Sequence, residues 1–186
     1  MSDHELVARA QGGDHAAFGQ LVDEHRGAVF RAAMAVLGSP SEADEAAQEA
    51  FVAAYRQLGS FKGAASFKTW LLAIAWRRAL DHRRRLRSRW RRFVSGEGVG
   101  YELWPAGGPS PERQLIDTRL GGDVRRLVNG LPERLRSPLL LAASGDHTYE
   151  EMAVILGKRV GTVKWQVSEA RRLLRERLAT LGYGDE

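Results

Sequence analysis

The stretch Gly161–Arg172, GTVKWQVSEARR, has the spacing of a helix with one buried face. At about 100° per residue, the apolar side chains that fall together on one side are Val163, Val167, Ala170 and Leu174. The opposite side carries Lys164, Trp165, Ser168, Glu169 and Arg172. A tryptophan on the solvent-facing side of a short helix indicates that this face contacts another molecule.

A second helix is predicted just before this one. Thr148 and Glu151 form a capping box at its start, and Gly157 ends it. Residues 158–160 make a turn, and the next helix begins near Thr162. Two helices joined in this way are typical of a helix-turn-helix, whose second helix normally lies in the major groove of DNA. An ordinary helical hairpin is the alternative.

The N-terminal half also has helical spacing throughout and no strand-like alternation. The sequence predicts a helix over residues 5–11, a second from the cap Asp14 to Leu37, a third from a Ser41–Asp44 capping box to Leu58, and a fourth capped by Ser66. The side chains expected on the inner side of the fourth helix are Phe67, Trp70, Leu71 and Ile74. Four helices with short connections predict a bundle over about residues 4–92.

Residues 93–112 are rich in Gly, Pro and Ser and have no sustained period, so they are predicted to form a flexible linker. A loop of that length is uncommon inside one compact domain. Helical spacing resumes near Pro111 and continues to Leu181, with Gly182 at the expected C-terminal cap. The predicted fold is therefore all-α, with one small helical domain over residues 1–92 and another over residues 113–186.

Composition excludes several classes of function. The chain has 186 residues and no cysteine, so it has no disulfide framework, thiol nucleophile or cysteine-ligated zinc. No apolar run approaches the roughly 20 residues of a membrane span, and the polar N-terminus does not resemble a signal peptide, which predicts a cytoplasmic protein without membrane insertion. No histidine pairs with acids at metal-ligand spacing on one helix, so the histidines are expected to be surface or core residues and no metal or cofactor is predicted.

The net charge of +5 conceals a strong segregation along the chain. Residues 1–60 hold 4 Lys/Arg against 9 Asp/Glu, whereas residues 61–92 hold 11 against 1. An acidic segment followed by a basic one indicates two different partners, one of them polyanionic. A solvated charged surface is the simpler alternative.

Two motif sets resemble the extracytoplasmic-function (ECF) branch of the sigma-70 family of RNA polymerase sigma factors. The segment EADEAAQEAFVAAYRQLGSFKGAASFKTWLLAIAWRRALDHRRR resembles domain two of that family, on the positions Asp44, Glu45, Gln48, Glu49, Phe51, Phe61, Phe67, Thr69, Trp70, Leu71, Ile74, Ala75 and Asp81. The C-terminal third resembles domain four, on Leu131, Pro132, Arg136, Glu151, Ala153, Gly157, residues 161–164, Ala170 and Arg171. The resemblance implies a protein that binds core RNA polymerase, directs it to promoter DNA and has no catalytic residue of its own.

The resemblance assigns polymerase docking to the acidic turn of the third predicted helix. The residues that match the family's contact with the clamp helices of the largest polymerase subunit are Asp44, Glu45, Gln48, Glu49 and Val52. Carboxylates beside small apolar residues suit a basic, partly apolar helix. The alternative is that these are solvated acids favoured by the helix dipole.

Opening of the minus-10 element is implied for the loop and helix that follow. The candidate residues are Ser60, Phe61, Lys62, Trp76, Arg77, Arg83, Arg84 and Arg85. In the family the loop at Gly59–Ser66 holds a base flipped out of the duplex, although Phe61 could equally be a core residue. Trp76 falls opposite Ile74, off the apolar stripe, whereas Trp70 is expected in the core. Arg77 stands where the family usually has asparagine, which leaves the base preference open.

The minus-35 element is implied as the ligand of the helix-turn-helix. The candidate residues are Lys158, Arg159, Thr162, Lys164, Trp165, Ser168, Glu169 and Arg172. Relatives commonly have serine and arginine at positions 165 and 166 and a basic residue near 169, so Trp165, Gln166 and Glu169 are departures. An indole can contact a thymine methyl group and a carboxylate can accept from cytosine N4, which predicts base contacts. Packing of Trp165 against a regulator or the polymerase flap is the alternative.

Two other classes of protein compete with this interpretation. One is a stand-alone helix-turn-helix regulator with an N-terminal sensor bundle, which would have no reason to carry the acidic turn or the FKTWL motif. The other is a nucleic-acid-processing enzyme, which would need clustered carboxylates near the basic segment, where only Asp81 is present. Many relatives of the family are held inactive by an anti-sigma factor, so an external regulator of this kind is also expected as a partner.

Overall fold

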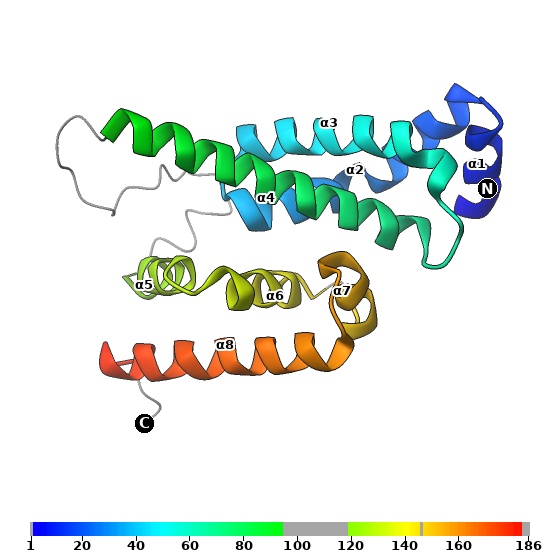
Figure 1. The fold of residues 1–186 in the computed structure, drawn as a ribbon. Helices are drawn as coiled ribbons and strands as arrows, with labels where there is room; N and C mark the ends of the chain where they lie inside the picture. Colours follow the sequence, from blue (N-terminus) through cyan, green and yellow to red (C-terminus); the bar gives the residue numbers. More distant parts are fainter. Residues whose placement is uncertain (1, 95–118, 146, 184–186) are drawn as a thin grey trace. The chain divides into compact units, whose positions relative to one another are not determined.

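The computed structural model describes residues 2–94, 119–145 and 147–183, and every regular element in these ranges is a helix (Figure 1). The chain divides into two compact units, Met1–Gly107 and Gly108–Glu186. The first contains α1 (Asp3–Gln11), α2 (His15–Leu37), α3 (Pro40–Gln57), the short 3₁₀ helix η1 (Leu58–Ser60) and α4 (Phe67–Val94). The second contains α5 (Arg119–Asn129), α6 (Glu133–Ala143), α7 (Tyr149–Leu156) and α8 (Val160–Thr180).

Local capping residues define where the helices of the first unit begin. Asp14 accepts a hydrogen bond from the backbone of Ala17, as predicted, and Ser66 accepts one from the backbone of Thr69 just before α4. The predicted Ser41–Asp44 capping box is wrong. The helix α3 begins one residue earlier at Pro40, whose fixed φ suits the first helical position, and Ser39 is its N-cap.

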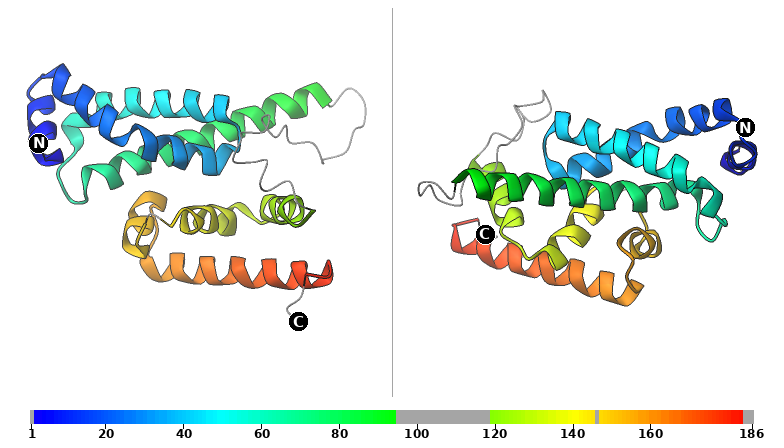
Figure 2. Two further views of the ribbon diagram at one scale, coloured as in Figure 1. Left: turned by 180° about the vertical axis from the view of Figure 1, so that it is seen from behind. Right: turned by 45° about the horizontal axis from the view of Figure 1, so that its top comes forward.

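The core of the first unit lies between α2, α3 and α4, which run side by side in all views (Figures 1 and 2). The face of α3 that is buried consists only of alanines, Ala43, Ala46, Ala47, Ala50, Ala53 and Ala54. These small side chains allow a close approach of the neighbouring helices, and larger residues of α2 and α4 fill the space. They include Leu21, Leu71, Leu72 and Trp76, all at most 2% exposed.

In the second unit the helix-turn-helix is formed by α7 and α8. The predicted capping box is confirmed, because Thr148 accepts from the Glu151 backbone while Glu151 accepts from that of Thr148. Gly157 ends α7 with a φ of 64°, a left-handed conformation that favours glycine. The helix α8 starts at Val160, two residues before the predicted start at Thr162. The predicted buried stripe is confirmed at Val163, Val167 and Ala170, whereas its fourth member, Leu174, is only partly buried. Ala170 packs with Leu131, Leu135 and Leu139.

Part of the predicted linker falls on helix. The helix α4 continues through Val94, so the first two linker residues belong to it. The rest of that linker, residues 95–112, and the predicted restart of helix near Pro111 lie outside the described residues. Within the described ranges, no helix combines the length and apolar character needed to cross a membrane.

Candidate functional site

The acidic candidates of α3 form an exposed face on the first unit. Asp44, Glu45 and Gln48 are exposed, and Val52 is 51% exposed although it is apolar. Asp44, Gln48 and Val52 are spaced four residues apart along one side of α3, and Glu45 flanks them. Gln48 Nε2 donates to Asp44 Oδ2 at 2.8 Å, which orders the polar part of this face. An exposed valine beside ordered carboxylates provides both an apolar and an acidic contact for a partner.

Tyr55 extends this face and was missed by the sequence analysis. It lies three residues after Val52, is 42% exposed, and its hydroxyl is held 2.7 Å from His15 Nδ1. Its ring also meets Phe18 edge-on at 5.0 Å between centroids. The continued three-to-four-residue spacing from Val52 was the available signal.

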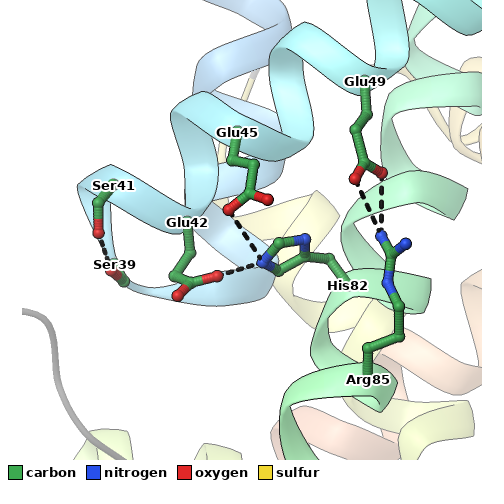
Figure 3. Close-up of polar contacts among 7 residues, drawn as sticks. All are labelled: Ser39, Ser41, Glu42, Glu45, Glu49, His82 and Arg85. Carbon is green, nitrogen blue, oxygen red and sulfur yellow. Dashed lines mark hydrogen bonds and ion pairs between the residues drawn. The ribbon is translucent and has the colours of Figure 1, made fainter.

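Not all the carboxylates on α3 are available to a partner, because some contact α4 (Figure 3). Glu49 accepts two hydrogen bonds from Arg85, at 2.9 and 3.2 Å. His82 lies between Glu42 and Glu45, paired with the first and 3.9 Å from an oxygen of the second. The exposed polymerase candidates are therefore Asp44, Glu45, Gln48 and Val52, whereas Glu49 and Arg85 are engaged with each other.

The loop before α4 presents a partly exposed aromatic cluster. The ring centroid of Phe61 lies 5.8 Å from that of Phe67 and 5.2 Å from that of Trp70. Both Phe61 and Trp70 are only half-buried, so the expectation that Trp70 is a core residue is wrong. Gln11 of α1 donates to the Leu58 and Phe61 carbonyls at 2.9 and 3.0 Å and fixes the loop. Exposed Ser60 and Lys62 flank a surface on which a base could stack.

Two candidates on α4 are corrected by their burial. Trp76 is 1% exposed and Arg83 is 6% exposed, so neither side chain can contact DNA in this structure. Six consecutive residues from Leu71 to Trp76 are buried, because α4 packs against both α2 and α3 and its buried face is wider than one stripe. The Arg83 guanidinium lies inside and donates to the Val36 carbonyl at 3.4 Å.

Two further candidate arginines of α4 lie on the surface. Arg77 is exposed, and the Arg84 side chain is 74% exposed while paired with Asp81 at 3.1 Å. An exposed ion pair of this kind is weak and can exchange for a phosphate. Among the arginines of α4 that were predicted to contact DNA, Arg77 and Arg84 are therefore the two that are exposed and not paired with α3.

The outer face of α8 carries the expected set of side chains. Trp165 is 54% exposed, and Thr162, Lys164 and Ser168 are exposed, as is Arg159 in the turn. The Lys164 ammonium lies 5.5 Å from the ring centroid of Tyr149 on α7, a cation–π contact that links the two helices. The exposed indole and these polar groups therefore form one continuous outer surface of the helix-turn-helix.

Lys158 and Gln166 lie behind this face. Lys158 Nζ donates to Gln166 Oε1 at 2.9 Å, and Gln166 is 7% exposed. Burial lowers the pKa of the Lys158 ammonium, against the opposing influence of Glu133. The pair therefore joins the turn to the recognition helix, and Lys158 is half-buried instead of fully available to DNA.

Glu169 and Arg172 are bound to each other. Arg172 donates to both Glu169 oxygens at 2.9 and 2.7 Å and also to Glu176. These donations lower the pKa of the Glu169 carboxyl, and the hydrogen bonds to Glu169 and Glu176 raise the pKa of Arg172. Sequence spacing placed both residues on the outer face but did not reveal that one carboxylate holds the only arginine predicted there.

Two helical units, as far as the structure describes them, with an exposed acidic helix face, a basic helix and a helix-turn-helix, are typical of a two-domain transcription factor. Family models match both units: Sigma-70 region 2 matches residues 21–89, and Sigma-70, region 4 matches residues 122–174. The chain belongs to the ECF branch of the sigma-70 family and is an RNA polymerase sigma factor of that type.

Curated relatives match over nearly the full chain. The RNA polymerase sigma-H factor of Pseudomonas aeruginosa is 32% identical over 191 residues, covering 96% of this chain and 95% of the relative. The ECF RNA polymerase sigma-E factor of Escherichia coli K12 is 33% identical over 188 residues, covering 97% of this chain and 96% of the relative.

Solved structures give the same family. CnrH, in complex with the cytosolic domain of CnrY, is similar with a TM-score of 0.68 and 25% identity over 96% of this chain and 97% of that one. The sigma factor RpoE of Bartonella quintana, in complex with the anti-sigma factor NepR, is similar with a TM-score of 0.61 and 26% identity. The match covers 87% of this chain and 96% of RpoE. The stand-alone regulator is therefore not favoured, since both sigma domains are matched in order.

Proposed function

We propose that residues 1–92 bind core RNA polymerase and open the minus-10 element, and that residues 113–186 bind the minus-35 element, with residues 93–112 as the linker. The observation that carries this proposal is the pair of exposed faces, acidic and apolar on α3 and polar with an indole on α8. No catalytic role is proposed, because the factor acts by binding and the bond-forming chemistry belongs to the polymerase. The proposed place of action is the cytoplasm, where the polymerase works.

The direct test of this function is a pull-down with core RNA polymerase followed by run-off transcription from a promoter library. The expected result is a stoichiometric complex that initiates only at a subset of promoters with a shared minus-10 and minus-35 pair. A chain that binds DNA alone and never associates with core polymerase would contradict the proposal and would support the stand-alone regulator.

We also propose that an anti-sigma factor regulates this chain. Two solved relatives are described in complex with such a partner or with a cytosolic domain of another protein. Co-purification of the tagged chain from its native cells, before and after added core polymerase, tests this proposal. A partner displaced by the polymerase is the expected result.

The exposed arginines of α4 give a prediction about salt dependence. Replacing Arg77 and Arg84 by alanine should weaken promoter-complex formation and flatten its dependence on salt by about one unit of slope per lost phosphate contact. Promoter binding measured by filter retention at several salt concentrations checks this result, with Arg26→Ala on α2 as a matched exposed control. A slope equal to that of the wild type would mean that these arginines only solvate the helix.

The recognition helix gives a prediction about base preference. Trp165→Ala should weaken binding to the cognate promoter by about 1–3 kcal/mol, as expected for a lost base contact. Glu169→Ala should relax the preference at one minus-35 position and leave nonspecific DNA affinity unchanged or slightly higher, because Arg172 loses a carboxylate partner. A minus-35 library selection measures both effects. Retention of the wild-type preference at every position by Glu169→Ala would exclude a base-reading role.

A further inference from the structure

The seam between α3 and α4 contains three metal-ligating side chains from two helices (Figure 3). Glu42 and Glu45 lie one turn apart on α3, and His82 faces them from α4. One donor atom from each residue lies within 4.8 Å of the other two. Spacing along one helix could not reveal this group, because tertiary packing of α3 on α4 creates it.

The charges in this seam are unequal from one turn to the next. Glu49 is balanced by the Arg85 guanidinium, a one-to-one pair. One turn earlier, two carboxylates share a single imidazole. A divalent cation between Glu42 and Glu45 would remove this excess of negative charge.

The burial of the three ligands also suits a metal ion. The His82 side chain is 3% exposed, with Nε2 directed at the carboxylates and with Nδ1 buried and lacking a hydrogen-bond partner among the described residues. The carboxylates are open to solvent, with Glu42 31% and Glu45 64% exposed. A fixed imidazole and two adjustable carboxylates leave an entry path and room for a water ligand.

We propose that Glu42, Glu45 and His82 form a binding site for a divalent transition-metal ion such as Zn²⁺. Imidazole nitrogen combined with carboxylate oxygen suits zinc and its neighbours, whereas Mg²⁺ and Ca²⁺ prefer oxygen ligands alone. Zinc accepts three protein ligands plus water, at about 2.0–2.2 Å from each nitrogen or oxygen donor. Two donors at that distance from one tetrahedral ion stand about 3.3–3.6 Å apart. Glu45, now 3.9 Å from His82, needs only a small movement, whereas Glu42, now paired with His82 Nε2, has to move back to admit the ion.

A second group in the same unit is less suitable and serves as a control. Asp3, Glu24 and His25 also lie within 4.8 Å of one another. His25 Nε2 contacts both oxygens of Asp3, at 2.9 and 3.1 Å, just as His82 Nε2 contacts Glu42 in the first group, so the difference lies in the third residue. Glu24 directly precedes His25 on α2, and adjacent helical residues point about 100° apart. Glu24→Gln is therefore a variant of similar chemistry that should not affect the proposed site.

Titration of the full chain with Co²⁺, followed by visible absorption, and with Zn²⁺, followed by calorimetry, tests the proposal. The wild type and Glu24→Gln should each bind one equivalent with equal affinity. Glu42→Gln and Glu45→Gln should each weaken binding by about 10-fold or more while retaining the wild-type circular dichroism spectrum. The substitutions are made at the two carboxylates and not at His82, because removal of the buried imidazole would perturb folding. Absence of metal binding by the wild type would overturn the site. So would a metal affinity in Glu42→Gln and Glu45→Gln that equals the affinity of the wild type.

Discussion

Replacing Asp44 and Glu45 by lysine is expected to reduce the affinity for core RNA polymerase by about 100-fold or more. Both side chains are exposed on the α3 face that is proposed to meet the clamp helices. Reversing the charge at these two positions replaces attraction to a basic helix by repulsion. Like charges across an interface cost several kcal/mol of binding free energy. Since each 1.4 kcal/mol is about tenfold in affinity, two reversals suffice for this loss. Surface-immobilised core polymerase provides the measurement.

The structure decides which acids this experiment should change. Glu49 accepts two hydrogen bonds from Arg85, so a lysine at position 49 would break a contact within the domain as well as alter the surface. Glu49 is therefore excluded from the variant, whereas Glu45 is kept because its side chain is 64% exposed and lies 3.9 Å from its neighbour His82 on α4. Asp23→Lys with Glu24→Lys is a matched control, because these acids are exposed on α2. Equal loss of affinity in the control would assign the effect to net charge and contradict the proposed face.

Much of the fold could be predicted because the signals were local. The Thr148–Glu151 box, the Asp14 cap and the left-handed Gly157 each depend on residues within one helical turn. Val163 and Val167 were identified as buried by spacing alone. The Ser41–Asp44 box failed for an equally local reason, because Pro40 already starts the helix and Ser39 precedes it.

The errors in the candidate site have a tertiary cause. A helix that packs on one neighbour buries a single stripe, and that assumption placed Trp76 and Arg83 on the DNA side. The helix α4 instead packs against α2 and α3, so residues on both flanks of the stripe are enclosed. The pairs Glu49–Arg85 and Glu42–His82 join residues about 40 positions apart, which no spacing rule detects. The available arginines are consequently fewer than the sequence indicated.

Trp76→Ala is expected to destabilise the first unit by about 3–5 kcal/mol, because it removes the largest fully buried side chain among the described residues and leaves a cavity where α4 packs against α2 and α3. Urea unfolding of the full chain measures this change. Trp76→Phe should cost much less, since the ring retains most of the apolar contact and the Trp76 Nε1 donor has no hydrogen-bond partner among the described residues.

Trp165→Ala should affect the free energy of unfolding far less than Trp76→Ala does. Its indole is 54% exposed, so its removal should change the free energy of unfolding by about 0.5 kcal/mol or less while weakening promoter binding. Trp76→Ala should show the reverse order, with lost stability as the primary effect. If Trp76→Ala kept wild-type stability and lost only minus-10 melting, the buried position would be contradicted and the indole would belong to the DNA surface after all.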